Sequence, residues 1–357
     1  MSVDPQFWRG KRVFVTGHTG FKGGWLALWL KEMGARVAGY ALAPATDPSF
    51  FAVCKIAEGM TSEIADIRDG ARLAASLARA EPEIVLHLAS QPLVRRSYED
   101  PVETYSTNVL GLVHLFEAAR RAPSLRVLVN VTSDKCYENR EWHWGYRESE
   151  PMGGYDPYSS SKGCAELVTS AYRRSFFAKA KDGVALASAR AGNVIGGGDW
   201  NTDRLVPDLI KGIEAGKTVV LRSPDSIRPW QHVLEPLSGY LVLAQALWAK
   251  GQAFAEGWNF GPTDADCRTV REIAEALLRH SESKVGLRIE SEGQPHEAKF
   301  LKLDCSLAAA RLGWRPRWSV DKAIERTVAW HRGFRAGQDP IKLAASQIAE
   351  YATSART

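Results

Sequence analysis

A tyrosine and a lysine four residues apart could carry acid–base chemistry in this chain of 357 residues. Tyr158 and Lys162 stand at the start of a predicted helical stretch, residues 163–177, and this spacing places two side chains on one helix face. An ammonium beside a phenol favours the phenolate, so we expect Lys162 to lower the pKa of Tyr158 from its ordinary value of about 10. The pair could then remove a proton from a hydroxyl group while a hydride leaves the same carbon. The alternative is an ordinary pair of surface side chains, because the spacing is common by chance.

Three polar residues directly after a predicted strand, residues 126–131, could add a further step. Open α/β sheets bind their ligands at the carboxyl ends of the strands. Ser133 could hydrogen-bond a reacting hydroxyl beside Tyr158. Asp134 and Lys135 are ionisable groups that an oxidation alone would not need, which favours an additional proton transfer. Taken in isolation, they could equally form a solvated turn with an ion pair.

A glycine-rich turn near the N-terminus indicates a dinucleotide cofactor. Residues 16–23 read TGHTGFKG and lie between the first predicted strand and the first predicted helix. Gly17 would permit a tight turn, Gly20 would let the backbone approach a pyrophosphate, and Gly23 would let the helix pack closely on the strand. The phosphates would then lie on the unpaired N–H groups at the helix N-terminus.

The end of the second strand lacks the acidic residue that normally binds the adenosine ribose of NAD. The chain runs Gly39-Tyr40-Ala41-Leu42 there, and its next carboxylate is Asp47. No arginine follows that could bind the extra phosphate of NADP, so NAD is the predicted cofactor, although this position alone does not decide between the two. Asp66 and Ile67 could hold the adenine, or Asp66 could be the N-cap of the next helix.

Alternating strands and helices predict a Rossmann-type doubly wound parallel sheet with a smaller, interleaved C-terminal substrate lobe. Strands are expected at residues 12–16, 36–40, 83–88 and 126–131, and helices at 25–30, 105–122, 163–177, 270–279 and 320–335. Residues 1–190 would form the NAD-binding domain, to which 230–262 return. Residues 191–229 and 263–340 would form the substrate lobe, and 341–357 a tail whose end frays.

The composition is that of an ordinary globular protein, with 45% hydrophobic and 24% charged residues and a net charge of +5. The basic residues form no block, so no nucleic-acid partner is expected. The chain has no secretory signal and no apolar run of roughly 20 residues, so we expect no membrane partner. The five cysteines form no C-x-x-C pair, which argues against a metal site or disulfides and favours the cytoplasm.

Together these motifs resemble the extended short-chain dehydrogenase/reductase family over nearly the whole chain. The matching segments are residues 16–23, His87-Leu88-Ala89, Asn108 with Gly111, Ser133, Tyr158 with Lys162, and Arg190-Ala191-Gly192-Asn193. Within the family, residues 7–8, 21–25, 132–137 and 228–233 resemble the sugar-nucleotide 4,6-dehydratase branch that takes CDP-glucose. Most other branches carry Asp-Glu where this chain has Asp134-Lys135.

The resemblance implies a three-step reaction that converts CDP-glucose to CDP-4-keto-6-deoxyglucose, the first step towards 3,6-dideoxyhexoses of surface polysaccharide. Tyr158 would deprotonate the C4 hydroxyl as hydride passes to NAD, Asp134 would protonate the departing 6-hydroxyl, and the hydride would return to C6. The base at C5 stays open. Lys135 could take that proton if it is neutral, or stabilise the enolate as a cation.

By the same resemblance the site residues fall into three groups. The catalytic residues would be Ser133, Asp134, Lys135, Tyr158 and Lys162. The cofactor would be held by Gly17, Thr19, Gly20, Phe21, Lys22, Gly23, Asp66, Ile67, Leu88, Ala89, Gln91, Asn108, Thr132, Tyr158 and Lys162. The nucleotide sugar would contact Gln91, Ser133, Asn193, Arg204, Arg228, His296 and Glu297.

Two other functions fit parts of the pattern. The first is another NAD-dependent enzyme of the family, such as a 4-epimerase or a dehydratase for another nucleotide sugar; an epimerase would not need Asp134 and Lys135. The second is a non-catalytic dinucleotide sensor, which the intact Tyr158, Lys162 and Ser133 argue against. The helices at 105–122 and 158–177 are expected to pair across a two-fold axis in a homodimer or homotetramer.

Overall fold

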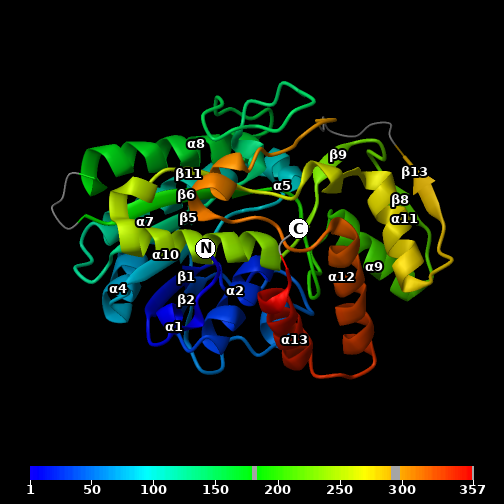
Figure 1. Cartoon of the computed structure of the whole chain (residues 1–357), viewed down its shortest axis with the longest axis horizontal. Coiled ribbons are helices and arrows are strands. Elements are labelled where there is room, and N and C mark those ends of the chain that lie inside the picture. The colour runs from blue at the N-terminus through cyan, green and yellow to red at the C-terminus, as the bar shows by residue number, and fades with distance from the viewer. Residues whose placement is uncertain (179–182, 291–297, 356–357) are drawn as a thin grey trace.

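Short apolar segments form the middle of a parallel sheet (Figure 1). The structure is a computed structural model that describes residues 1–178, 183–290 and 298–355. Within those ranges seven strands pair in parallel in the order β11-β6-β5-β4-β1-β2-β3. They are β1 (Arg12–Thr16), β2 (Arg36–Ala41), β3 (Thr61–Ile64), β4 (Ile84–His87), β5 (Val127–Val131), β6 (Ala185–Ala191) and β11 (Gly257–Phe260). The order reverses between β1 and β4, the switch point of a doubly wound sheet, and this confirms the predicted fold class.

Helices cover both faces of the sheet, which is why its central strands β4, β5 and β6 are buried along their whole length and are mostly apolar. On one face Val13 and Val15 pack in a core with α2 (Phe21–Glu32) and α10 (Leu234–Lys250). On the other face Phe14 packs in a second core, together with α4 (Gly70–Ala80), α7 (Gly111–Ala119) and α8 (Pro157–Tyr172). The edge strand β3 was not predicted, because its sequence is polar and only β2 pairs with it.

The C-terminal lobe has an apolar core of its own and lies beside the sheet (Figure 1). This core joins α9 (Leu205–Ala215), α11 (Val270–Ser281) and the first half of α12 (Val320–Arg335). Three short strand pairs complete the lobe and its junction with the sheet: β8 (Val219–Leu221) with β13 (Leu287–Ile289), β9 (Ile227–Pro229) with β12 (Cys267–Thr269), and β7 (Val194–Ile195) with β10 (Gln231–His232).

Several expected helices are divided. The stretch 105–122 consists of the end of α6 (Pro101–Tyr105), the π-helical turn η1 (Ser106–Leu110) and α7, and α8 continues into the π-helical turn η3 (Arg173–Phe177). The other short elements are α1 (Pro5–Trp8), α3 (Phe50–Val53), α5 (Val94–Glu99), η2 (Asp134–Cys136), η4 (Gly251–Phe254), η5 (Asp264–Asp266) and η6 (Ala308–Leu312). None of the helices in the described ranges is both long enough and apolar enough to cross a bilayer.

The end of the chain was wrongly predicted to be a fraying tail. It forms α13 (Pro340–Thr353), which begins at the N-cap Asp339 and buries Ile348 and Tyr351 in the core beneath the sheet. The Asp-Pro start was a readable helix signal. The predicted substrate lobe included residues 263–340. Its boundary differs in the structure, because Trp314 and Trp318 pack in the core beneath the sheet and not in the core of the lobe.

A buried carboxyl ties the C-terminal segment to α10. Glu235 accepts hydrogen bonds from the backbone N–H groups of Arg317 (2.9 Å) and Trp318 (2.7 Å) and from the Tyr351 hydroxyl (2.7 Å). Burial raises the pKa of Glu235 to about 7. Since the pKa of an unfolded glutamate is near 4.5, this residue favours the folded state fully below pH 4.5, and that contribution is lost as the pH rises through about 7.

We therefore expect Glu235→Gln to flatten the pH dependence of stability. The amide oxygen can still accept the two N–H groups, while the amide has no charge to desolvate. Wild type should lose on the order of 3 kcal/mol of unfolding free energy between pH 4.5 and 8 through this group, and the variant should not. Urea unfolding at pH 5 and pH 8 measures the difference. The exposed Glu275 provides the control: Glu275→Gln should keep the wild-type pH dependence, and an equal dependence in Glu235→Gln would contradict the assignment.

Candidate active site

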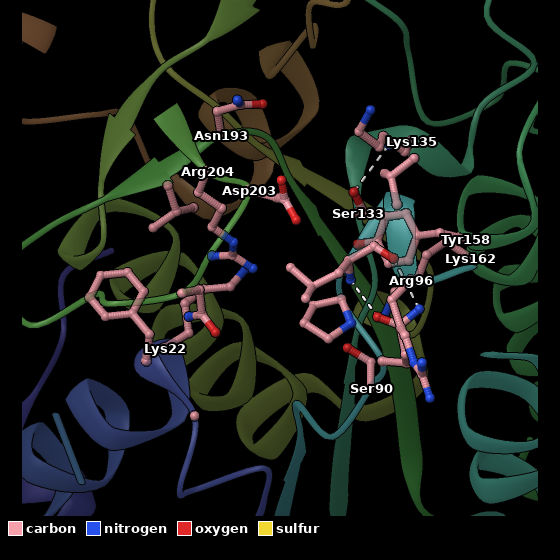
Figure 2. A pocket seen from close by; sticks show the side chains of 18 of the residues that line it. Lys22, Ser90, Arg96, Ser133, Lys135, Tyr158, Lys162, Asn193, Asp203 and Arg204 are labelled. Carbon is pink, nitrogen blue, oxygen red and sulfur yellow. Dashed lines mark hydrogen bonds between the residues drawn. The ribbon is translucent and has the colours of Figure 1, made fainter. Parts of the chain in front are cut away.

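A cavity of about 1030 Å³ opens where the carboxyl ends of the central strands face the C-terminal lobe. All but three of the predicted site residues line it: Gly17, Thr19, Gly20, Phe21, Lys22, Gly23, Asp66, Ile67, Leu88, Ala89, Gln91, Thr132, Ser133, Asp134, Lys135, Tyr158, Lys162, Asn193, Arg204 and Arg228. Of the other three, Asn108 lies behind the wall, and His296 and Glu297 fall outside the described residues. Figure 2 shows Ser133, Tyr158 and Lys162 on one side of the cavity, with Lys22 and Arg204 on the other.

Ser133 organises the turn that follows β5. Its hydroxyl donates to Asp134 Oδ1 (2.9 Å) and accepts from the backbone N–H of Lys135 (3.2 Å), so Ser133 is the N-cap of η2. This short 3₁₀ turn places three consecutive side chains at the carboxyl end of a central strand. The solvated turn that the sequence left open is excluded for Asp134, which is only 3% exposed.

Asp134 is a buried carboxyl whose environment favours the protonated form. Burial raises its pKa above the ordinary value, although the charge of Lys135, the hydrogen bond from Ser133 and the charge of Arg228 oppose the rise. Its second oxygen, Oδ2, is buried and has no hydrogen-bond partner among the described residues. That oxygen lies against Gly192, where a Cβ would come within 3.1 Å of it. A protonated Oδ2 would therefore be a proton donor that no described residue accepts from.

Tyr158 and Lys162 are both buried at the start of α8, and Lys162 Nζ lies 5.8 Å from the centre of the phenol ring. Burial raises the pKa of Tyr158 to about 12, while a hydrogen bond with Ser133 opposes the rise. Burial, followed by the charge of Lys22, lowers the pKa of Lys162 to about 7. The pKa of the phenol is thus raised and not lowered as expected, because desolvation penalises its charged form.

The glycine turn leaves room for a phosphate at the start of α2. Gly17 has a φ of +76°, and a Cβ there would lie 2.7 Å from the backbone nitrogen of Ala89, at the end of β4. Gly23 packs against the carbonyl of Gly17, so its closest contact is with the turn and not with the strand. Gly20 is different: a Cβ would meet only Gly17 O, at 3.4 Å, and no side chain caps the helix. These residues fit a dinucleotide, because the first-turn N–H groups face an uncrowded space.

A half-buried cation, Lys22, lies in this part of the cavity. Burial and the charge of Arg204 lower the pKa of Lys22 to about 8, whereas Asp134 opposes the change. Lys22, in the first turn of α2, thus adds positive charge where phosphates would bind. Its place in the glycine motif predicted a cofactor contact, but its proximity to Asp134 and Arg204 needed the tertiary structure.

The nucleotide end of the cavity is formed by the second and third strands. Ala41 and Leu42 line it, as do Asp66 and Ile67. The carboxylate of Asp66 accepts hydrogen bonds from the Arg68 guanidinium at 2.5–3.0 Å. The alternative role as a helix N-cap is wrong, because Asp69 caps α4.

Asn108 supports the wall from behind. Its side chain accepts from the backbone N–H of Gln91 (2.8 Å) and donates to Gln91 O (3.1 Å) and to Ser161 Oγ (2.8 Å). The Ser161 hydroxyl in turn donates to Tyr158 O (2.7 Å). Asn108 therefore links two walls of the cavity through Gln91 and α8, and it does not face the cofactor space as the sequence had suggested.

The lobe contributes cations and an apolar surface. Arg228 is 2% exposed and donates to Ile227 O (2.9 Å), whereas Arg204 pairs with Asp199 (3.3 Å). Asn193 lies in the segment between β6 and β7. Apolar residues that the sequence did not single out form the far end of the cavity: Leu205, Val206, Val219, Leu221, Trp230 and Val270. They come from separate segments and carry no local signal of a site.

Residues 14–327 match the family model described as GDP-mannose 4,6-dehydratase. The chain is 56% identical to the CDP-glucose 4,6-dehydratase of Salmonella typhimurium over 352 residues, 98% of each chain, and 31% identical to the dTDP-glucose 4,6-dehydratase of Streptomyces antibioticus over 74% of each. Its fold is similar to that of a dTDP-glucose 4,6-dehydratase from Streptomyces venezuelae crystallised with NAD, with a TM-score of 0.78 at 24% identity over 92% of this chain and 99% of that one. The chain therefore belongs to the GDP-mannose 4,6-dehydratase family.

Proposed function

We propose that this chain is a hydro-lyase that converts CDP-glucose to CDP-4-keto-6-deoxyglucose with bound NAD. The observation that carries the proposal is the buried Asp134 carboxyl, which follows Ser133 in the same cavity as Tyr158 and whose Oδ2 has no hydrogen-bond partner within the described part of the chain. A neutral acid beside an oxidising tyrosine is what the removal of water from an oxidised sugar requires. The choice of CDP-glucose is supported by the 56% identity to the Salmonella typhimurium enzyme of that name.

Oxidation at C4 would use Tyr158 as the base and Ser133 as the hydrogen-bonding partner of the hydroxyl. Bound NAD would supply the hydride acceptor for C4, the hydride donor for C6 and a positive ring that favours the Tyr158 phenolate. Lys162, close to the phenol, would hold the cofactor ribose and keep the tyrosine oriented.

Elimination would use Asp134 as the acid. The 4-ketone acidifies the C5 proton, and a proton from Asp134 lets the 6-hydroxyl leave as water. Burial raises the pKa of Asp134 above its ordinary value, which favours the protonated form that this step would need. Lys135 also lines the cavity and could remove the C5 proton as a neutral amine, or stabilise the enolate as a cation.

The diphosphate of the substrate would be bound by Arg228, Arg204 and Asn193, since guanidinium groups match phosphate oxygens in pairs. Arg228 and Arg204 both line the cavity on the side of the lobe. The apolar far end, with Trp230 and Val219, would enclose the base.

Because all five cysteines are free thiols, we also propose the reducing cytoplasm as the compartment.

We further propose a homodimer built on the helices around α8. Large apolar side chains are exposed on these neighbouring elements, among them Val102 of α6 (76% exposed) and Leu167 of α8 (61%). Leu110 and Phe176 of the two π-helical turns are exposed as well. Clustered apolar side chains of this size are typical of a subunit interface.

The substrate assignment predicts one product. The purified protein, with added NAD, should convert CDP-glucose to a 4-keto-6-deoxy sugar that gives the alkali-stable chromophore of such ketones. UDP-glucose, dTDP-glucose and GDP-mannose should react at least about tenfold more slowly, since recognition of the base is expected to contribute over 1 kcal/mol. No product from CDP-glucose would show that the proposed substrate is wrong.

The roles of the tyrosine and the aspartate can be separated. Tyr158→Phe should abolish oxidation, with a loss of about 10²–10⁴ in kcat and no absorbance of reduced cofactor. Asp134→Asn should still oxidise the sugar and so accumulate reduced cofactor, while product formation falls by a similar factor. Asp225→Asn, at an exposed carboxylate of the lobe, should keep the wild-type rate. A full rate in Asp134→Asn would rule out the acid assignment.

The dimer can be tested at the exposed leucine of α8. Leu167→Glu should give a single-chain mass in sedimentation at micromolar concentration, because a charge would be buried at the interface. Ile289→Glu places the same charge on a partly exposed strand of the lobe and should leave the mass unchanged. A wild-type mass in both variants would place the interface elsewhere.

A further inference from the structure

A buried ion pair lies beneath the turn that carries Ser133 and Asp134. Glu166 of α8 and Arg190 of β6 are joined at 2.8 Å, with side-chain exposures of 3% and 6%. Neither residue lines the cavity. Glu166 stands four residues after Lys162 and eight after Tyr158, so it belongs to the inward face of the same helix.

The pair holds the catalytic turn at both of its ends. The Thr132 hydroxyl, directly before Ser133, donates to Glu166 Oε1 (2.5 Å). Arg190 donates through its other amino group to the hydroxyl of Tyr137 (2.7 Å), the residue directly after η2. The Tyr137 hydroxyl in turn donates a hydrogen bond to Oδ1 of Asn259 in β11 (2.7 Å).

Stability alone does not account for these contacts. Burying two charges costs several kcal/mol per ion, and apolar residues of similar volume often serve a core as well or better. Both Glu166 oxygens are satisfied, since Oε2 also accepts from Ser188 (2.6 Å). Burial would raise the pKa of Glu166, but Arg190 and these hydrogen bonds keep it below its ordinary value, so the pair stays charged and directional.

We propose that Glu166 and Arg190 are positioning residues for the reaction: they fix the turn Ser133–Cys136 relative to the helix of Tyr158 and Lys162. The proposal rests on the proposed function, because it assigns Tyr158 and Asp134 to successive steps on one sugar. Both steps need their groups in place around the same bound molecule. A displacement of about 1 Å between the turn and α8 would misalign the acid with the leaving hydroxyl and could cost about 10²-fold in rate.

The test replaces both charges together. The full-length double variant Glu166→Gln/Arg190→Met leaves no unpaired buried charge and so separates positioning from stability. We expect kcat for dehydration of CDP-glucose to fall about 10- to 100-fold, with KM and the dissociation constant of NAD within about threefold of wild type. A folded double variant with kcat within about twofold of wild type would overturn the proposal.

A matched pair of single variants decides the question if the double variant does not fold. Tyr137→Phe removes the link between Arg190 and the turn, whereas Ser188→Ala removes a hydrogen bond to the same ion pair from a residue outside the turn. We expect Tyr137→Phe to lower kcat at least about fivefold more than Ser188→Ala at similar unfolding midpoints; equal kcat values would overturn the proposal. If wild type does not convert CDP-glucose, the substrate is wrong, and the same comparison is made on the nucleotide sugar that it does convert.

Discussion

Burial of ionisable groups at the carboxyl edge of the sheet is the constraint on which the site depends. Asp134, Lys162 and Lys22 are all enclosed where the strand ends meet the lobe, and burial is the largest cause of the pKa shift of each. It makes the acid harder to ionise and the amines easier to neutralise. Burial therefore shifts the carboxyl and the two lysines towards their uncharged forms within one cavity.

These groups can be enclosed because backbone segments approach the walls of the cavity closely at two glycines. Gly17 lies against the end of β4, and Gly192 leaves room for the Asp134 carboxyl, so a side chain at either position would displace part of the wall. The two charged residues behind the cavity are stabilised differently, by pairing with each other. Glu166 and Arg190 are also buried, yet they remain ionised because each has a partner within hydrogen-bonding distance. The groups that we propose exchange protons line the cavity, whereas Glu166 and Arg190 lie behind it.

Much of the fold could be predicted from the chain, and the exceptions have physical causes. The central strands were readable because burial on both faces requires mostly apolar residues. The polar edge strand β3 was not, since it is exposed on one side. The C-terminal helix was missed although Asp339 and Pro340 mark its start and Tyr351 anchors it. Asn108 was assigned to the right region but to the wrong side of the wall, because a sequence motif does not show where a side chain points.

The sequence by itself determined the chemical groups of the site and the family, because glycine spacing, the Tyr–Lys interval and the Ser-Asp-Lys turn are local patterns. It also determined the doubly wound sheet, through the period and burial of its strands. Only the tertiary structure decided the protonation tendencies of Tyr158 and Asp134, the proximity of Lys22 to Asp134 and Arg204, and the ion pair that spans the turn Ser133–Cys136. Desolvation and charge coupling depend on which segments meet in space, and residues such as Thr132, Glu166 and Arg190 are far apart along the chain.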